Sequence, residues 1–91
     1  MQLRWTSRAL SDLARRHEFL SLVNPPAAVR TVQMLAGAPT SLLTHPRIGE
    51  ALEEFSPREV RRILVGQYEM RYEIQDGVIY VLRLWHTRED R

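Results

Sequence analysis

The chain has 91 residues, 13 Lys+Arg against 11 Asp+Glu, and a formal net charge of +2. This length predicts one domain spanning residues 1–91 and excludes a multi-domain enzyme. A hydrophobic content of 44% argues against disorder, and the absence of cysteine excludes disulfides, thiolate metal sites and a cysteine nucleophile. Since no apolar run approaches the roughly 20 residues that cross a bilayer, we expect a cytoplasmic protein with no membrane partner.

Every basic residue is an arginine, and lysine is absent. Enzymes that depend on a Schiff-base lysine or a P-loop lysine are therefore excluded. Codon usage in a GC-rich genome is the simplest origin of this bias. Acidic and basic residues alternate along the chain without a block of like charge, which argues against a simple polyanion-binding protein.

The first half of the chain is predicted to be mainly helical. Alternation over residues 2–5 indicates a short strand, and Thr6 or Ser7 can cap a helix that begins near Ser7. Asp12 is placed to meet Arg16 one turn further on. The expected inner stripe of this helix comprises Leu10, Leu13, Ala14, His17 and Leu20 or Ser21.

Prolines and glycines define the next segments. The tripeptide 24–26, Asn-Pro-Pro, ends the first helix and opens a second. Gly37 and Pro39 break its pattern, which predicts either one bent helix or two segments before residues 41–43. The stretch 45–49, His-Pro-Arg-Ile-Gly, is interpreted as the turn that leads from helix to sheet.

From Gly49 the hydrophobic period changes to two, which predicts strands. Asp76-Gly77 is a strong hairpin signal, Gly66-Gln67 marks a second hairpin, and a strand around residues 50–55 is expected to join the sheet. The second hairpin pairs Val65 with Tyr68, Ile63 with Met70, and Arg61 with Tyr72. The first pairs Gln75 with Val78, Ile74 with Ile79, Tyr72 with Val81, Met70 with Arg83, and Tyr68 with Trp85.

This register sorts the sheet into two faces. Arg61 and Arg83 fall on the core face, and we expect them near sheet ends, meeting Asp12, Glu18 or a terminal carboxylate. The core face is predicted to carry Ile63, Val65, Tyr68, Met70, Tyr72, Ile74, Ile79, Val81 and Trp85. The other face is predicted to carry Val60, Arg62, Leu64, Glu69, Arg71, Glu73, Tyr80, Leu82, Leu84 and His86.

On the second face, Leu64, Leu82 and Leu84 would form an apolar patch rimmed by charges. Such a patch is typical of a partner-binding surface. The alternative is that a C-terminal segment covers it, although the printed sequence continues for only five residues after His86.

Cofactor and metal chemistry find no support in the sequence. The three histidines, His17, His45 and His86, lack metal-ligand spacing, and no phosphate-binding glycine motif occurs. No serine has a nearby histidine to activate it. We therefore expect no metal and no cofactor.

The order of these pieces resembles the RelE/ParE superfamily of type II toxin–antitoxin toxins, closest to the ParE-like, plasmid-stabilisation branch. The resemblance implies an α+β fold, with an N-terminal strand and a helical hairpin packed on one face of a mainly antiparallel sheet. The matching pieces are Trp5 with Ala9 and Asp12-Leu13, Asn24-Pro25 with Ala27-Ala28, Leu43 with residues 45–49, residues 58–61, residues 66–74 and residues 81–90.

The resemblance also implies partners. A cognate antitoxin, of the ParD-like ribbon-helix-helix type, would neutralise the toxin in a hetero-oligomer. ParE-like toxins poison DNA gyrase, whereas RelE-like relatives are ribosome-dependent mRNA endoribonucleases. The two targets imply an inhibitory binding protein and a nuclease respectively.

Three departures argue against RelE-type cleavage. Glu69 follows Tyr68 where the nuclease motif has an arginine, and a carboxylate there would repel the scissile phosphate. The catalytic lysines of RelE-type members have no counterpart, and their C-terminal tyrosine is absent because the sequence reads Glu89-Asp90-Arg91 at its end. A gyrase inhibitor without a catalytic site is therefore favoured.

The nuclease alternative stays open because Arg88 and His86 match positions of ribonuclease members. His86 with Glu50, Glu53 or Glu54 would form an acid-base pair, and Arg71 or Arg62 would replace the missing arginine. The ribonuclease site would then comprise His86, Arg88 and Arg71.

Arginine-rich elements of the sheet and tail are the expected target-binding surface, although each arginine has a carboxylate nearby in sequence and is equally suited to a structural ion pair. For the antitoxin we expect contact with Leu64, Leu82 and Leu84, or with a groove along the helices, or strand addition at a free sheet edge. The target-binding candidates are Arg58, Arg61, Arg62, Arg71, His86 and Arg88.

Overall fold

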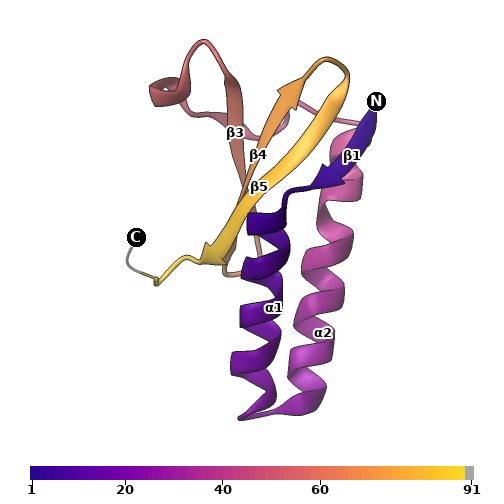
Figure 1. Ribbon diagram of the computed structural model, residues 1–91, viewed down its shortest axis with the longest axis vertical. Helices are drawn as coiled ribbons and strands as arrows, with labels where there is room; N and C mark the ends of the chain where they lie inside the picture. The colour runs from indigo at the N-terminus through magenta and orange to yellow at the C-terminus, as the bar shows by residue number, and fades with distance from the viewer. Residues whose placement is uncertain (90–91) are drawn as a thin grey trace.

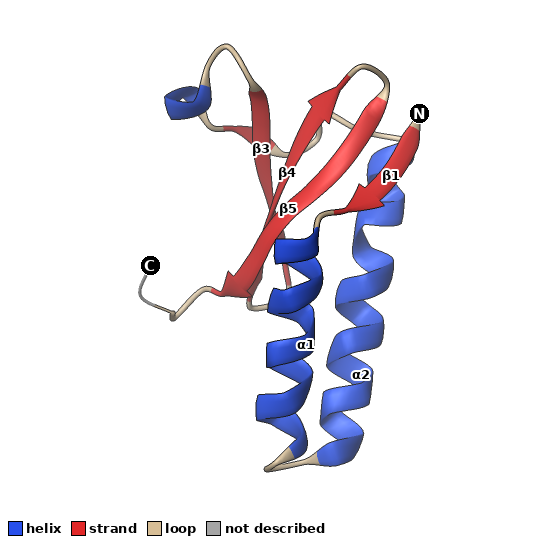
Figure 2. Cartoon of the chain, in the orientation of Figure 1, coloured by secondary structure: helices blue, strands red, loops and turns tan. Residues whose placement is uncertain are grey.

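A computed structural model describes residues 1–89 of the chain and shows an α+β fold in which two antiparallel helices pack on one face of a five-stranded sheet (Figures 1 and 2). The predicted fold class is confirmed. The last residues of the matched tail, Asp90 and Arg91, lie outside the described residues. The elements are β1 (Gln2–Trp5), α1 (Ser7–Ser21), α2 (Pro25–Gly37), the 3₁₀ helix η1 (Ala38–Leu43), β2 (Glu50–Ala51), the 3₁₀ helix η2 (Glu53–Phe55), β3 (Glu59–Val65), β4 (Tyr68–Gln75) and β5 (Val78–His86).

Both helices begin at side-chain caps. Thr6 accepts a hydrogen bond from the Ala9 amide at 3.2 Å, and Asn24 accepts one from the Ala27 amide at 3.2 Å. The second helix does not bend at Gly37; it is followed by η1, so two segments form. The inner stripe of α1 differs from the expected one, because Ala9 and Asp12 are buried whereas Leu10 and His17 are exposed.

The strand order is β1-β5-β4-β3-β2, with β1 parallel to β5 and the other pairs antiparallel. Both predicted hairpin turns form. Asp76 and Gly77 have φ angles of 51° and 75°, as a tight turn of this hand requires, and Gly66 has a φ of 60°. The predicted register between β3 and β4 is confirmed along its whole length.

The register between β4 and β5 is as predicted only as far as Tyr72 opposite Val81. A β-bulge at Leu82 then shifts the pairing by one residue, so that Met70 lies opposite Leu84. Expected positions beyond the bulge are therefore wrong. Leu84 is 3% exposed and packs in the core instead of on the second face. The corrected pairs are Arg71 with Arg83, Met70 with Leu84, Glu69 with Trp85, and Tyr68 with His86.

The bulge lies where β5 changes its neighbour. β1 pairs with β5 only as far as Val81, and beyond this point α1 follows the strand edge. The Thr6 hydroxyl lies 3.0 and 3.1 Å from the carbonyl oxygens of Val81 and Leu82, while Asp12 accepts a hydrogen bond from the Leu84 amide at 3.0 Å. The side chains of Thr6 and Asp12 thus form hydrogen bonds with backbone groups at the edge of β5 where no neighbouring strand is present.

The core lies between the helices and the sheet, in two clusters of buried side chains. The first cluster comprises Ala9, Leu35, Tyr68, Met70, Val81 and Leu84. The second comprises Leu42, Tyr72 and Ile79.

The predicted strand at residues 50–55 is much shorter than expected, since β2 covers Glu50–Ala51 and η2 follows. The Leu52 amide nevertheless still bonds to the Val60 carbonyl at 2.9 Å.

Tyr72 fixes the turn that leads from the helices to the sheet. Its hydroxyl donates to the Pro46 carbonyl at 2.7 Å and accepts from the Gly49 amide at 3.0 Å. Burial raises the pKa of the Tyr72 hydroxyl, so the group keeps its proton and both bonds. A Cβ at Gly49 would lie 2.7 Å from that hydroxyl and from the Arg62 carbonyl oxygen, which explains the glycine there.

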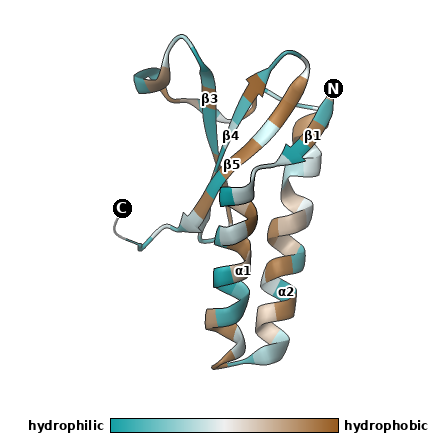
Figure 3. Ribbon diagram, in the orientation of Figure 1, coloured by the Kyte–Doolittle hydropathy of each residue, from teal (hydrophilic) through white to brown (hydrophobic). Residues whose placement is uncertain are grey.

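The helical hairpin extends well beyond the sheet (Figure 1). Hydrophobic residues continue to the tip of this projection (Figure 3). Leu22 and Val23 at the tip are 83% and 80% exposed, and Phe19 on the last turns of α1 is also exposed. Among the described residues, neither helix has the length and hydropathy needed to span a membrane.

Candidate functional site

The Asp12 side chain lies between α1 and β5 and holds the helix against the strand. Its carboxylate accepts two hydrogen bonds from Arg83, at 2.8 and 3.2 Å, in addition to the Leu84 amide, and also pairs with Arg15. Burial would raise the pKa of the Asp12 carboxyl, but these hydrogen bonds and the charge of the two arginines outweigh it, so the pKa is lowered. The expected pairing of Arg83 with Asp12 is confirmed. The expected Asp12–Arg16 pair does not form.

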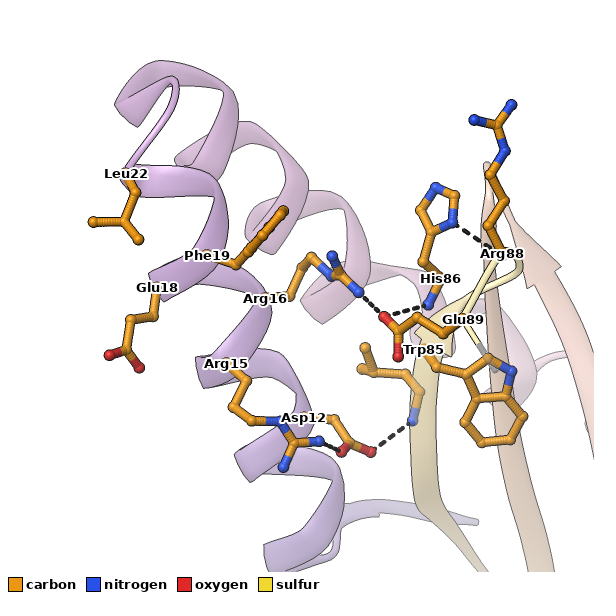
Figure 4. A pocket seen from close by; sticks show the side chains of 11 residues that line it. Asp12, Arg15, Arg16, Glu18, Phe19, Leu22, Trp85, His86, Arg88 and Glu89 are labelled. Atoms are coloured by element: carbon orange, nitrogen blue, oxygen red, sulfur yellow. Dashed lines mark hydrogen bonds and ion pairs between the residues drawn. The ribbon is translucent and has the colours of Figure 1, made fainter. Parts of the chain in front are cut away.

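A groove of about 910 Å³ opens beyond Asp12, between the second half of α1 and the end of β5 with the segment that follows it (Figure 4). We call it the α1–β5 groove. Phe19 and Leu22 give one wall an apolar surface, and Leu84 and Trp85 contribute to the other. Its charged and polar lining residues are Asp12, Arg15, Arg16, Glu18, His86, Arg88 and Glu89.

Arg16 and Glu89 form an ion pair across this groove (Figure 4). The Arg16 guanidinium also lies over the rings of Phe19 and Tyr68, with its central carbon 5.7 and 5.4 Å from their centroids. The Glu89 carboxylate additionally accepts a hydrogen bond from the His86 amide at 3.2 Å. One arginine of the helix thus links two aromatic rings to the segment after β5.

His86 lies on the helix side of the sheet, opposite the expected face, because the bulge places it beside Tyr68. The two rings pack edge to face, with centroids 5.2 Å apart. Nδ1 of His86 accepts a hydrogen bond from the Arg88 amide at 3.1 Å, which assigns the ring proton to Nε2, 3.1 Å from the Gln67 side-chain oxygen. Both ring nitrogens therefore have protein partners.

The second face of the sheet is organised around the buried carboxylate of Glu69. Arg62 and Arg71 approach this carboxylate to 3.3 and 3.6 Å. The guanidinium of Arg71 also lies over two rings, with its central carbon 5.3 Å from the centroid of Phe55 and 4.8 Å from that of Trp85. Trp85 was expected in the core; the bulge moves it to this face.

The remaining arginines of this region also have carboxylate partners. Arg58 makes two hydrogen bonds to Glu73, at 2.8 and 3.0 Å, and these bonds raise the pKa of the Arg58 guanidinium. Arg61 bonds to Glu59 at 3.0 Å and to the Gly49 carbonyl at 2.8 Å. Hydrogen bonds from Arg47 and Arg61 lower the pKa of Glu59 despite its partial burial.

The target-binding candidates therefore separate into two locations. Arg58, Arg61, Arg62 and Arg71 are held in ion pairs on β3, β4 and the turn before them, whereas His86 and Arg88 line the α1–β5 groove. The postulated trio of His86, Arg88 and Arg71 is divided between two faces of the sheet. Within residues 1–89, Arg88 is the one arginine of this set whose side chain has no hydrogen bond or ion pair.

The expected antitoxin patch is also divided. Leu64 is 67% exposed, Leu82 is half-buried at the bulge, and Leu84 belongs to the core. A contiguous patch of three leucines is therefore wrong, and antitoxin contact at Leu64 and Leu82 stays a prediction.

The sequence predicted antitoxin contact along a groove of the helices but did not identify the residues that line it. Its residues Arg16, Phe19 and Leu22 lie off the stripe assigned to the helix core, and a bulky apolar residue outside a buried stripe was the available signal. Among the described residues, no group of His, Asp and Glu has the arrangement of a metal site.

Comparisons with known proteins agree on a toxin of a type II toxin–antitoxin system, while their names divide between ParE and RelE. Residues 3–91 match the family model described as the ParE toxin of the type II toxin–antitoxin system parDE. Toxin RelE2 of Caulobacter vibrioides is 34% identical over 86 residues, covering 94% of each chain. A solved structure described as the chromosomal ParDE toxin–antitoxin system from P. aeruginosa superposes with a TM-score of 0.80 at 21% identity, covering 94% of this chain and 95% of that one.

Proposed function

Because the chain belongs to the ParE toxin family of type II toxin–antitoxin systems, we propose that it inhibits growth by binding DNA gyrase in the cytoplasm. In this proposal the toxin has no catalytic site, and it stabilises gyrase in its DNA-cleaving state. A cognate antitoxin, of the ParD-like ribbon-helix-helix type, neutralises it in a hetero-oligomer.

The observation that carries this proposal is that the arginines on the second face of the sheet are already paired with carboxylates of the same chain. A ribonuclease requires cationic groups that are free to stabilise charge on the transferring phosphate. Here Arg62 and Arg71 share the buried carboxylate of Glu69, and Arg58 is bound to Glu73. A phosphate entering this face would meet two carboxylates whose arginines are already paired, which disfavours phosphate chemistry there.

The geometry of His86 supports the same conclusion. A general base needs a ring nitrogen within hydrogen-bond reach of the proton that it removes. Nδ1 of His86 accepts a hydrogen bond from the Arg88 amide, and Nε2 lies within hydrogen-bond distance of the Gln67 side chain. Arg71, the cation of the postulated ribonuclease site, lies on the other face of the sheet. His86 is thus suited to holding the turn after β5.

For the gyrase contact, Arg88 is the strongest single candidate. Its side chain has no ion pair within the described chain and lies at the rim of the groove. A guanidinium without an ion pair among residues 1–89 can pair with a carboxylate of the enzyme or a phosphate of its DNA. The paired arginines Arg58, Arg61, Arg62 and Arg71 would instead support the fold around this contact.

For the antitoxin, the α1–β5 groove is the better of the proposed surfaces. It combines exposed apolar side chains, Phe19 and Leu22, with charged groups at its rim. An amphipathic helix is the kind of segment that such a groove accepts. Leu64 on β3 and Leu82 on β5 are proposed as further, separate antitoxin contacts.

The decisive experiment assays the purified chain against gyrase supercoiling and against ribosome-bound mRNA. We expect inhibited supercoiling with accumulation of cleaved DNA, and we expect Arg88→Gln to lose at least about tenfold in potency, as for a charged contact. Arg30→Gln, which changes an exposed arginine on α2, is the matched control and should retain activity.

Cleavage of mRNA that is abolished by His86→Ala would overturn the gyrase proposal and establish the ribonuclease. That outcome has one observation in its favour, the name of the Caulobacter relative, Toxin RelE2. Inactivity in both assays, with intact antitoxin binding, would indicate a chain retained for complex formation alone.

A further inference from the structure

Arg16 is the most constrained cation of the α1–β5 groove. Its side chain is 17% exposed and lies over two aromatic rings, which hold the guanidinium in one place. Because its side chain is oriented before any partner arrives, little conformational entropy remains to be lost when a carboxylate binds. Arg16 is therefore a preformed anchor for an anionic group inside an apolar groove.

That anchor is occupied by a partly exposed carboxylate of the same chain, Glu89. Glu89 is 44% exposed, and partly exposed ion pairs contribute little to stability. The Glu89 carboxylate also accepts a hydrogen bond from the His86 amide at 3.2 Å, and three amide hydrogen bonds hold the segment that carries it. The Thr87 amide donates to the Gln67 carbonyl at 2.9 Å, the Arg88 amide donates to His86, and the Glu89 amide donates to the His86 carbonyl at 2.9 Å.

We propose that Glu89 is an internal competitor of the antitoxin, and that a carboxylate on an amphipathic helix of the antitoxin displaces it from Arg16. Displacement breaks the Arg16–Glu89 pair and releases residues 87–89 from the position that they hold in the free toxin. Since Arg88 belongs to this segment, the antitoxin would neutralise the toxin both by filling the groove and by displacing Arg88. The inference rests on the proposed antitoxin partner.

Charge in the groove supports an acidic occupant. Once Glu89 leaves, the lining contains Arg15, Arg16 and Arg88, while Asp12 remains bound to Arg83 and Arg15. Glu18 is then the remaining lining carboxylate without an ion pair in the described chain. Apolar side chains of the incoming helix would pack on Phe19 and Leu22, with its carboxylate directed at Arg16.

The test compares antitoxin affinity among three single variants. The probe is the antitoxin recovered from the co-expressed complex by separation in guanidinium and refolding. Glu89→Gln removes the competitor and should tighten binding about two- to fivefold, the range expected from a partly exposed ion pair. Arg16→Gln removes the anchor and should weaken binding at least about tenfold. Glu18→Gln removes one negative charge from the same groove and is the matched control.

If Glu89→Gln and Glu18→Gln changed antitoxin affinity equally, the proposal that Glu89 competes with the antitoxin would be wrong, because both changes would then act only through the total charge of the groove. Weaker binding of Glu89→Gln would also overturn it and make Glu89 part of the contact. If the wild-type chain binds no antitoxin, the proposed function itself fails. Loss of binding in an unfolded Arg16 variant is recognised by circular dichroism.

Hydrogen exchange gives an independent readout on the wild-type complex. The amides of Thr87, Arg88 and Glu89 are hydrogen-bonded in the free chain. On antitoxin binding they should exchange faster, while amides of α1 exchange more slowly. Slower exchange at all three amides would show that the segment stays in place, which contradicts the proposal.

Discussion

The first and second halves of α1 have opposite relations to the rest of the molecule. The first half buries Ala9 and Asp12 against the sheet, and its aspartate bonds to the edge of β5. The second half extends beyond the sheet and exposes Phe19, while Leu22 and Val23 follow at the tip. One helix therefore provides both a structural support and a surface that the chain itself leaves uncovered.

This difference shows how a small domain can separate stability from recognition. Surface that is buried in the free chain contributes to folding, whereas exposed apolar surface contributes when a partner covers it. Variants in the two halves should therefore affect different measurements. The first half should control the free energy of unfolding, and the second should control antitoxin binding.

The largest effect on stability is expected for Asp12→Ala. The change leaves Arg83 and the Leu84 amide without their shared acceptor. Because each hydrogen bond to a charged group contributes about 1.5–3 kcal/mol, losing both partners should cost about 3–5 kcal/mol. Urea unfolding of the variant should show a correspondingly lower midpoint. A loss under about 1 kcal/mol would mean that Asp12 does not hold α1 to β5.

The bulge predicts a marked contrast between two leucines that the regular register would treat alike. Leu84→Ala should lower the free energy of unfolding by about 2–4 kcal/mol, because it creates a cavity in the core. Leu64→Ala, at an exposed position, should change it by less than about 0.5 kcal/mol. Similar losses in thermal unfolding of both variants would contradict the register described for β5.

Acid should destabilise the first half of α1 through the same carboxylate. Because the pKa of Asp12 is lower in the folded protein than in the unfolded chain, the unfolded chain takes up its proton at higher pH. The free energy of unfolding should thus fall as pH decreases through the ordinary aspartate range toward the lowered pKa. Asp12→Asn should be less stable at neutral pH but show a flatter profile; a parallel profile would refute the assignment.

The smallest effect on stability is expected at the tip of the hairpin. Leu22→Ser and Val23→Ser should change the free energy of unfolding by less than about 0.5 kcal/mol, because both residues are exposed in the free chain. Leu22→Ser should nevertheless weaken antitoxin binding, since Leu22 lines the groove and Val23 does not. Calorimetric titration of both variants measures this difference.

Local patterns predicted the elements and the turns well. Alternation and turn residues gave both hairpins, and Asn24 with its prolines marked the helix boundary correctly. These features depend on a few neighbouring residues, so they are visible in one sequence. The family resemblance then supplied the arrangement of helices on the sheet.

The site was less predictable because it depends on contacts between distant segments. Alternation cannot report one extra residue in a strand, and the Leu82 bulge reversed the positions of Leu84, Trp85 and His86. Buried charge was equally hidden: Asp12 and Glu69 look like surface residues in the sequence, yet each binds arginines inside the structure. The α1–β5 groove arises from both effects together.

The Leu82 bulge also has a consequence for comparing relatives. A homologue that lacks one residue at this point would keep the same strand up to Val81 but present every later side chain on the opposite side. An alignment that places the gap elsewhere would equate residues that never occupy the same environment. The histidine at the end of β5 and the arginine after it in this chain are therefore best matched to those of a relative by their distance from the bulge, because a match that ignores it would assign a function to the wrong side of the sheet.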